Sequence, residues 1–148
     1  MVMDQAREND LTTTINLGAL RSVSDHLSSL LDKASEAERD VIAALPEGSA
    51  MLIALSGHAR GSRFLLNSES TTLGRSTDNE IFLDDVTVSR KHAEISRNGK
   101  TYSIRDCGSL NGTYVDGVIQ DKAELHDGME IQIGKYRLHF FLGGKVRA

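Results

Sequence analysis

The sequence contains one cysteine, one proline and no long apolar run. Because Cys107 has no second cysteine to pair with, an intramolecular disulfide is excluded, and a reducing, cytoplasmic setting is expected. We interpret Cys107 as a small apolar filler rather than a reactive thiol. No apolar stretch approaches the roughly 20 residues that cross a bilayer, so no membrane span is expected. The polar, acidic start MVMDQAREND does not resemble a secretory signal.

Basic residues are also too few for a general nucleic-acid-binding protein, because the net charge is −4. The charge is unevenly distributed. Residues 1–49 hold nine acids and four bases, a net −5, whereas residues 50–148 hold twelve acids and thirteen bases, a net +1. The sequence therefore predicts an acidic arm joined to a nearly neutral body, with no nucleic-acid partner.

The only proline, Pro46, lies in LPEGS (residues 45–49) and divides two kinds of pattern. Before it, apolar residues recur at helical spacing, which predicts one or two amphipathic helices between about residues 18 and 45. Such a segment has no core of its own, so we expect it to fray when alone and to fold on a partner. We expect the first sixteen residues to be disordered. The predicted domains are a regulatory arm, 1–49, and a folded domain, 50–148.

After Pro46, eleven glycines fall in residues 50–148 and the apolar period changes to two. RNGK and VDGV are signals of tight hairpin turns, and HDGM predicts a further turn. Many short strands about ten residues apart indicate an antiparallel β-sandwich. The expected strands are MLIAL, RFLL, TTLGR, EIFL, HAEISR, TYSIRD, TYV, GMEIQI and YRLHFFL.

Hydrogen-bond donors gather at the predicted strand ends and loops of this half. Sandwich loops cluster at the two ends of the fold, so residues distant in sequence can converge there. Arg75 offers a planar fork that matches phosphate oxygens. Ser89 offers a hydroxyl, Arg90 a second cation, and Asn111 an amide suited to holding a peptide backbone. A group rich in donors and without an obvious base indicates an anion receptor.

Structural alternatives exist for each of these residues. Gly74 fits a tight turn, Arg75 a surface arginine, and Asn111-Gly112 a turn. His92 is interpreted as a buried histidine that bonds a loop.

An enzyme with Ser89 as nucleophile and His92 as base is the functional alternative. We expect SRKH to start a strand, where residues three apart point to opposite faces and cannot share a proton. A triad also needs a third group and an oxyanion hole. The five histidines lack metal-ligand spacing, and no Gly-Lys-Ser/Thr phosphate loop is present. We therefore predict neither an enzyme nor a bound cofactor or metal.

The ordered set Gly-Arg, Ser-x-x-His and Asn-Gly resembles the forkhead-associated (FHA) family over roughly residues 50–143. This resemblance implies an all-β, antiparallel sandwich of about eleven strands that binds phosphothreonine peptides through loops at one end. The phosphothreonine-binding residues that it implies are Arg75, Ser89, Arg90, Ser109, Leu110 and Asn111. It gives Gly74, His92 and Gly112 architectural roles.

Within that family, GSRFLL, EIFLDDVTVSRKHAE, GSLNGTYV and EIQIGKYRL look like the actinobacterial inhibitors of 2-oxoglutarate dehydrogenase and their mycobacterial counterparts. The resemblance implies that a serine/threonine protein kinase phosphorylates the arm, which then docks into its own FHA domain and ends inhibition of the enzyme. Without a gap, Thr13 aligns with the docking position. Thr14, three residues before Leu17, is the next candidate, and Thr12 completes the cluster. The alternative is a scaffold whose FHA domain binds phosphorylated partners while its arm docks another protein.

Overall fold

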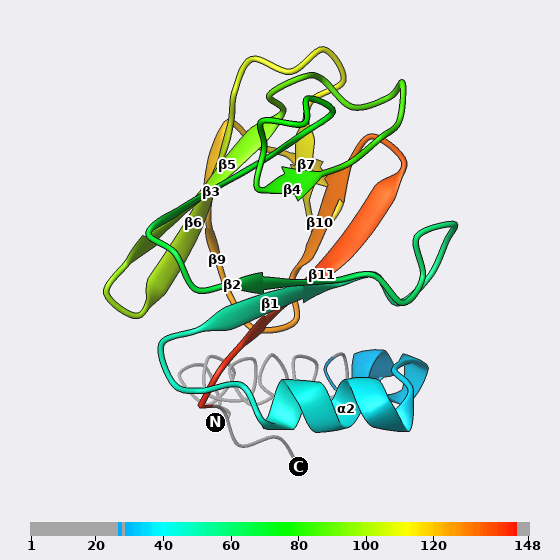
Figure 1. Ribbon diagram of the computed structural model, residues 1–148, viewed down its shortest axis with the longest axis vertical. Coiled ribbons are helices and arrows are strands. Elements are labelled where there is room, and N and C mark those ends of the chain that lie inside the picture. The colour runs from blue at the N-terminus through cyan, green and yellow to red at the C-terminus, as the bar shows by residue number, and fades with distance from the viewer. Residues whose placement is uncertain (1–26, 28, 145–148) are drawn as a thin grey trace, which may run out of the picture. The chain divides into compact units, whose positions relative to one another are not determined.

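The computed structural model in Figure 1 describes residue 27 and residues 29–144. The predicted disorder of the first sixteen residues, the threonine cluster and the start of the predicted helical segment lie outside the described residues. The chain divides into two compact units at Ser35, and the second unit contains one helix and all the strands. Its elements are α2 (Glu36–Ala43), β1 (Ala50–Ile53), β2 (Arg63–Leu66), β3 (Ser70–Gly74), β4 (Ile81–Phe82), β5 (Ala93–Asn98), β6 (Thr101–Asp106), β7 (Thr113–Val115), β8 (Val118–Ile119), β9 (Lys122–Leu125), β10 (Glu130–Ile133) and β11 (Tyr136–Leu142).

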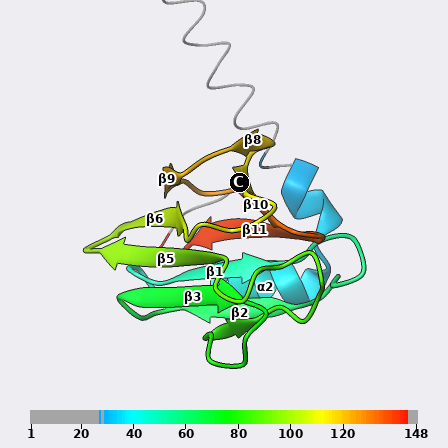
Figure 2. The same ribbon diagram turned by 90° about the horizontal axis from the view of Figure 1, so that it is seen from above.

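These strands form two sheets, with the orders β2-β1-β11-β10-β7-β8 and β4-β3-β5-β6-β9. The predicted sandwich of about eleven strands is confirmed. All pairs are antiparallel except β3 with β4, which is parallel. Two strands were not predicted from the sequence. They are β8 and β9, which are edge strands separated by residues 120–121 and lie at one side of the sandwich (Figure 2).

Both tight hairpin turns are where the sequence predicts them. Asn98 pairs with Thr101 across the β5–β6 turn, in which Gly99 has φ 66°. In the β7–β8 turn, Val115 pairs with Val118 across Asp116 and Gly117, and those two residues have φ values of 49° and 81°. Positive φ at both central residues matches the right-handed twist of the flanking strands. These turns set the registers of their hairpins.

The space between the sheets is filled by alternate residues of nearly every strand, as a period of two requires. The buried core consists of Ala50, Leu52, Ala54, Leu66, Leu73, Ile81, Leu83, Val88, Ala93, Ile95, Tyr102, Ile104, Val115, Leu125, Ile131, Ile133, Leu138 and Phe140. Among them, the ring of Tyr102 packs edge-on against Phe140 at 5.5 Å between centroids. This core fixes the strand ends from which the loops of the candidate site depart.

The helix α2 belongs to the same unit as the strands and lies next to β1 (Figure 1). Ile42 and Leu45 are buried. Four residues of β1 and β11 outside the inner core are buried as well: Met51, Ile53, His139 and Phe141. The backbone N–H groups of Gly143 and Gly144 donate to the carbonyls of Ser49 and Leu45, at 2.8 and 3.1 Å. The sequence places a domain boundary at residues 49–50, whereas the compact unit starts at Glu36 and includes α2.

Residues 29–33 are also helical, in the first unit, and the helix is broken at 34–35. In the part of the chain that the structure describes, no helix is long and apolar enough to cross a membrane.

Candidate functional site

The predicted site residues lie on loops at one end of the sandwich, where β3, β6 and β10 end and β5, β7 and β11 begin (Figure 1). Arg75 starts the β3–β4 loop. Ser89 and Arg90 lie in the β4–β5 loop, and residues 109–111 lie in the β6–β7 loop. Hydrogen bonds join all three loops, so the convergence expected from a sandwich is observed for these segments.

Arg75 is fixed to the β4–β5 loop at two points. Its backbone N–H donates to the carbonyl of Ser89 at 2.9 Å, and its Nε donates to the carbonyl of Val88 at 3.1 Å. The residue as a whole is exposed. Because Nε holds the guanidinium in place, the two terminal nitrogens of the fork are oriented in advance for an anion.

Ser89 connects this loop to the β6–β7 loop. Its Oγ accepts a hydrogen bond from the backbone N–H of Leu110 at 3.0 Å. A serine hydroxyl has one proton to donate as well as lone pairs that accept. Since Leu110 uses only an acceptor position, the Ser89 proton is still available for a ligand oxygen.

His92 is fully buried and joins the same two loops. Its Nδ1 accepts the backbone N–H of Ser89 at 3.1 Å, so the proton belongs on Nε2, which lies 2.8 Å from the carbonyl of Gly112. Neither ring nitrogen contacts the Ser89 hydroxyl in these bonds. This arrangement fits a structural histidine and does not fit a nucleophile beside its base.

The reason given from the sequence for separating Ser89 from His92 is wrong. β5 starts at Ala93, so residues 89–92 are loop and their side chains do not alternate between two sheet faces. The loop curls so that the His92 ring reaches the Ser89 backbone, because the buried ring needs partners for both nitrogens.

Asp106 organises the β6–β7 loop. Its carboxylate accepts the backbone N–H groups of Gly108 and Ser109 at 3.0 and 3.1 Å, and the hydroxyls of Ser109 and Thr113 at 2.5 and 2.7 Å. Burial raises the pKa of Asp106, but these hydrogen bonds outweigh it, so that the pKa lies below its ordinary value. The Ser109 hydroxyl also accepts the N–H of Gly112 at 2.9 Å. Ser109, predicted to contact phosphothreonine, therefore uses its hydroxyl inside its own loop.

Asn111 and Leu110 form the exposed tip of that loop, and Leu110 is 91% exposed. Nδ2 of Asn111 donates to the carbonyl of Thr87 at 2.9 Å, which orients the amide and leaves Oδ1 as an acceptor for an approaching chain. Asn111 therefore bridges the β6–β7 and β4–β5 loops.

The sequence analysis did not identify Thr87, which forms hydrogen bonds within its own loop and with two other segments of the chain. Its N–H and hydroxyl both donate to the Asp85 carboxylate, and its Oγ1 accepts the N–H of Lys135 from the β10–β11 turn at 3.0 Å. The Thr87 hydroxyl and N–H bonds lower the pKa of Asp85. An Asp two residues before a Thr is a recognisable Asx-turn signal, but the contacts of Thr87 with Lys135 and Asn111 have no signal in the sequence.

Gly74 and Gly112 are both required by close packing. A Cβ on Gly74 would collide with the carbonyl oxygen of Arg90, which also accepts Nδ2 of Asn79 at 2.7 Å. Gly112 has φ +84°, and a Cβ there would lie 2.6 Å from Cδ1 of Ile119. The two positions keep the β3–β4 and β6–β7 loops close to their neighbours. Among the described residues, no group of three or more His, Cys, Asp or Glu side chains could hold a metal ion.

Comparison with known proteins agrees with this geometry. The FHA domain family model matches residues 71–134. An oxoglutarate dehydrogenase inhibitor of Corynebacterium jeikeium is 57% identical over 101 residues, which cover 68% of this chain and 70% of that protein. The glycogen accumulation regulator GarA of Mycolicibacterium smegmatis is 54% identical over 101 residues, or 68% of this chain and 64% of that protein.

Solved structures show the same fold. A structure from a study of phosphothreonine-dependent FHA domain interactions is 31% identical, has a TM-score of 0.58, and covers 64% of this chain and 96% of that one. The chain belongs to the FHA family. Within it, the chain is similar to proteins named oxoglutarate dehydrogenase inhibitor and GarA.

Proposed function

We propose that this protein is a regulator that binds phosphothreonine peptides through the loop end of its sandwich. The observation that carries the proposal is the fixed placement of Arg75 and Ser89 on adjoining backbone, at 2.9 Å from N–H to carbonyl, beside Asn111. A solved relative at 31% identity comes from a study of phosphothreonine-dependent interactions, which supports the ligand class.

Each side chain of the site has a role in this proposal. The free ends of the Arg75 fork bind the phosphate oxygens, the Ser89 hydroxyl donates to one of them, and Arg90 adds positive charge. Oδ1 of Asn111 accepts an N–H of the bound peptide, and the exposed Leu110 contacts the peptide beside the phosphothreonine. Arginine forks and hydroxyls match phosphate because it offers several strong acceptor oxygens and close to two negative charges. Ser109 acts indirectly, by holding the loop that presents Leu110 and Asn111.

We further propose that the unphosphorylated protein inhibits 2-oxoglutarate dehydrogenase or a related metabolic enzyme in the cytoplasm. Relatives named oxoglutarate dehydrogenase inhibitor, at 57% identity over 101 residues, support this target. A serine/threonine protein kinase phosphorylates the arm at Thr13, or at Thr14 or Thr12, and the arm then occupies the site and releases the enzyme. The arm (1–49) and the FHA domain (50–148) are the two parts of this proposed switch, with α2 packed on the domain.

The length of the arm permits self-docking. Because α2 belongs to the domain, the tether runs from Thr13 to Glu36, about 23 residues, which extend to at most ~80 Å. Residues 29–33 of the tether are helical, and about 18 further residues, treated as a flexible chain, have a root-mean-square span of roughly 21–25 Å. Short tethers give effective concentrations in the millimolar range. With an assumed intrinsic Kd of about 1 μM, the form with the phosphorylated arm docked in its own site would be favoured about a thousandfold over the undocked form.

Calorimetry tests the binding chemistry. Full-length protein is titrated with a peptide of residues 8–20 phosphorylated on Thr13, and with the same peptide unphosphorylated. We expect Arg75→Ala to weaken the phosphopeptide by about tenfold to more than a hundredfold, since a hydrogen bond to a charged group contributes about 1.5–3 kcal/mol. Arg63→Ala, an exposed arginine on β2, is the charge-matched control. Equal affinity for both peptides would overturn the proposal.

The alternative function is a scaffold that binds phosphorylated partner proteins. The specific observation in its favour is that α2 lies at the end of the sandwich away from the site loops (Figure 1), so the arm must cross the domain to dock. NMR spectra of the phosphorylated protein at low and high concentration separate the two. Shifts at Arg75, Ser89 and Asn111 that are independent of concentration indicate self-docking, and shifts that grow with concentration indicate binding between molecules. In a separate assay, the absence of dehydrogenase inhibition at micromolar concentrations of the unphosphorylated protein would favour the scaffold function.

A further inference from the structure

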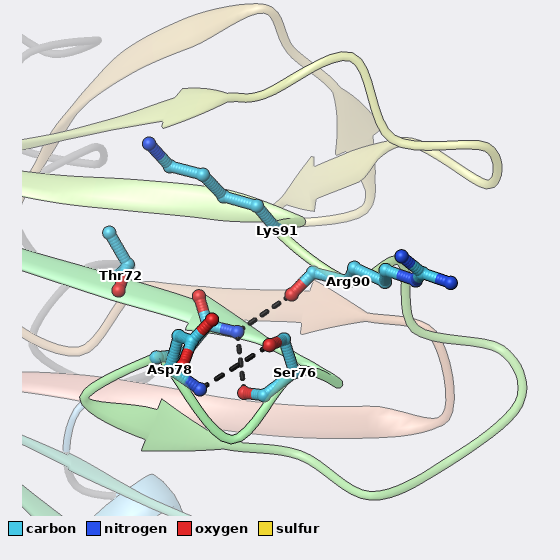
Figure 3. A pocket seen from close by; sticks show the side chains of 6 residues that line it. Thr72, Ser76, Asp78, Arg90 and Lys91 are labelled. Atoms are coloured by element: carbon cyan, nitrogen blue, oxygen red, sulfur yellow. Dashed lines mark hydrogen bonds between the residues drawn. The ribbon is translucent and has the colours of Figure 1, made fainter.

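A second pocket lies directly beside the candidate phosphate site (Figure 3). It has a volume of about 450 Å³ and is lined by Thr72, Ser76, Asp78, Asn79, Arg90 and Lys91. Ser76 follows Arg75 in the chain, and Arg90 follows Ser89, so the pocket and the phosphate site share a wall.

This wall is held firmly by hydrogen bonds. The carbonyl of Arg90 accepts both the backbone N–H of Ser76 at 3.2 Å and Nδ2 of Asn79 at 2.7 Å. Nδ2 of Asn79 also donates to the carbonyl of Ser76 at 2.8 Å. The β3–β4 loop is therefore fastened to the start of β5, and the pocket has a fixed shape before any ligand arrives.

The cations at this wall point in different directions. In Figure 3 the guanidinium of Arg90 lies on one side of its backbone and the ammonium of Lys91 on the other, above the loop that carries Ser76 and Asp78. Lys91 is exposed, and within residues 29–144 neither it nor Arg90 is in an ion pair. By contrast, the cations of Lys100, Arg105 and Arg137 each lie within 4 Å of a carboxylate.

The carboxylates near Lys91 differ in the number of hydrogen bonds and ion pairs that they already form. Glu94 is bound by the Ser70 hydroxyl and by Arg105, and Lys91 adds only a further lowering of its pKa. Glu80 accepts the N–H and hydroxyl of Thr72 at 2.9 and 2.8 Å. Asp78 is the only carboxylate in the pocket lining, and within residues 29–144 it accepts no hydrogen bond, so it is the group that opposes an anion there.

The arm sequence offers negative charge on one side of its threonines only. Asp10 precedes Thr13 by three residues, whereas Ile15, Asn16 and Leu17 follow the cluster. An extended chain advances about 3.3 Å per residue, so Asp10 would lie about 10 Å from the phosphothreonine. A peptide in this conformation would place its phosphate at the Arg75 site and the Asp10 carboxylate near Lys91, because Arg90 and Lys91 are adjacent in the chain and point to different sides.

We propose that this pocket is a second anion subsite, in which Lys91 and the Ser76 hydroxyl bind an anionic group located N-terminal to the phosphothreonine on the same peptide. The inference rests on the proposed phosphothreonine binding and adds a specificity determinant to it. A carboxylate at the position of Asp10 and a phosphate at that same position present the same chemistry. A phosphate binds more strongly because it carries more charge and more acceptor oxygens.

The test uses three phosphopeptides of residues 6–20 with the full-length, unphosphorylated protein at one fixed salt concentration. The first carries phosphate on Thr13, the second adds Asp10→Asn, and the third carries phosphate on Thr13 and a phosphoserine in place of Asp10. We expect the first to bind about two- to fivefold tighter than the second, as for an exposed ion pair. The third should bind about tenfold tighter than the first, which exceeds the factor of two available from two binding registers.

Three variants locate the effect. Lys91→Gln should remove the differences among the peptides while leaving the Asp10→Asn peptide within twofold of its original affinity. Asp78→Asn should enlarge the differences, a change of opposite sign that general loss of structure would not produce. Lys122→Gln, an exposed lysine on β9, is the control for net charge and should change none of them.

Equal affinity of the three peptides for the original protein would overturn the inference, as would an equal weakening of all three by Lys91→Gln. If these peptides still bind in a manner that depends on phosphate and on Arg75, the proposed function survives that result. If none of them binds better than its unphosphorylated form, both the proposed function and the second subsite fail.

Discussion

The two ends of the sandwich use their basic side chains differently. At the site end, Arg75, Arg90 and Lys91 are exposed and, within residues 29–144, in no ion pair. At the far end, Arg97 donates to the carbonyl of Gly48 at 3.2 Å and Lys100 lies 2.6 Å from the Glu47 carboxylate. Arg97 and Lys100 therefore hold the chain at the far end, whereas the charged ends of Arg75, Arg90 and Lys91 are exposed to solvent at the site end. The site loops are held by backbone groups, by His92 and by the Asp85 and Asp106 carboxylates, so these three cations are available for a ligand.

The largest effect is expected where the site end is held by a neutral buried group. His92→Ala removes the ring that joins Ser89 to Gly112 and leaves a buried N–H and carbonyl without partners. We expect unfolding free energy to fall by about 2–4 kcal/mol and phosphopeptide affinity to fall with it. Urea unfolding and calorimetry measure the two. Unchanged affinity would show that His92 does not position Ser89.

Arg97→Ala and Arg75→Ala should have different effects on stability and on peptide binding, because Arg97 is at the far end and Arg75 is at the site end. The first removes a half-buried hydrogen bond at the far end and should cost about 1–2 kcal/mol of stability, with phosphopeptide affinity unchanged. The second should weaken the peptide by about tenfold or more and should also lower the unfolding free energy by about 1 kcal/mol, because it removes the partly buried hydrogen bond from Nε of Arg75 to the Val88 carbonyl. If the two variants do not separate in this way, the division between the ends is incorrect.

The pH dependence of the site end should follow its carboxylates. The pKa of Asp106 lies below its ordinary value in the folded protein, so its hydrogen bonds contribute stability above the unfolded pKa of about 3.9 and lose it as pH falls through the lower, folded pKa. Hydrogen exchange at the amides of Gly108 and Ser109, in free protein, should therefore stay slow to about pH 4 and accelerate relative to the core below it. Asp106→Asn should abolish this step. A step at higher pH would contradict the assignment.

The smallest effect is expected for the exposed pair at the far end. The side chains of Lys100 and Glu47 are 73% and 69% exposed, and such exposed pairs contribute little to stability because solvent screens them. Lys100→Ala should therefore change the unfolding free energy no more than Lys122→Ala does, and it should not alter peptide binding. A larger loss, tested against Lys122→Ala as a matched exposed lysine, would mean that the far end depends on charge more than its geometry indicates.

Much of the fold was predictable because the local signals are strong. Alternating apolar residues mark β6 and β11, and the turns at Gly99-Lys100 and Asp116-Gly117 lie where the RNGK and VDGV signals predict them. The edge strands β8 and β9 carried no such signal. Val118 and Ile119 are both exposed and form a strand of only two residues, and KAEL in β9 contains helix formers that are placed in a strand by pairing with β6.

The site was predictable in its residue types and less so in its construction. Arg75, Ser89 and Asn111 were recognised because donors at strand ends are visible in the sequence. The bonds that hold them were not, because they join segments distant in the chain: Ser89 with Leu110, Thr87 with Lys135, and His92 with Gly112. Periodicity gives the face of a strand, but it gives no information about how a loop curls, and this is why the reasoning about residues 89–92 failed.

Gly143 and Gly144 approach Leu45 and Ser49 so closely that a Cβ on Gly143 would collide with the carbonyl of Pro46. The chain therefore enters and leaves the domain at one place, away from the phosphate loops. Domains with adjacent ends tolerate insertion into other proteins and circular permutation. The unit from α2 to β11 should therefore be transplantable into a surface loop of a host protein as a working module. A permutant opened at the Gly99 turn should still fold if the linker that joins Gly144 to Glu36 spans the roughly 12 Å length of α2.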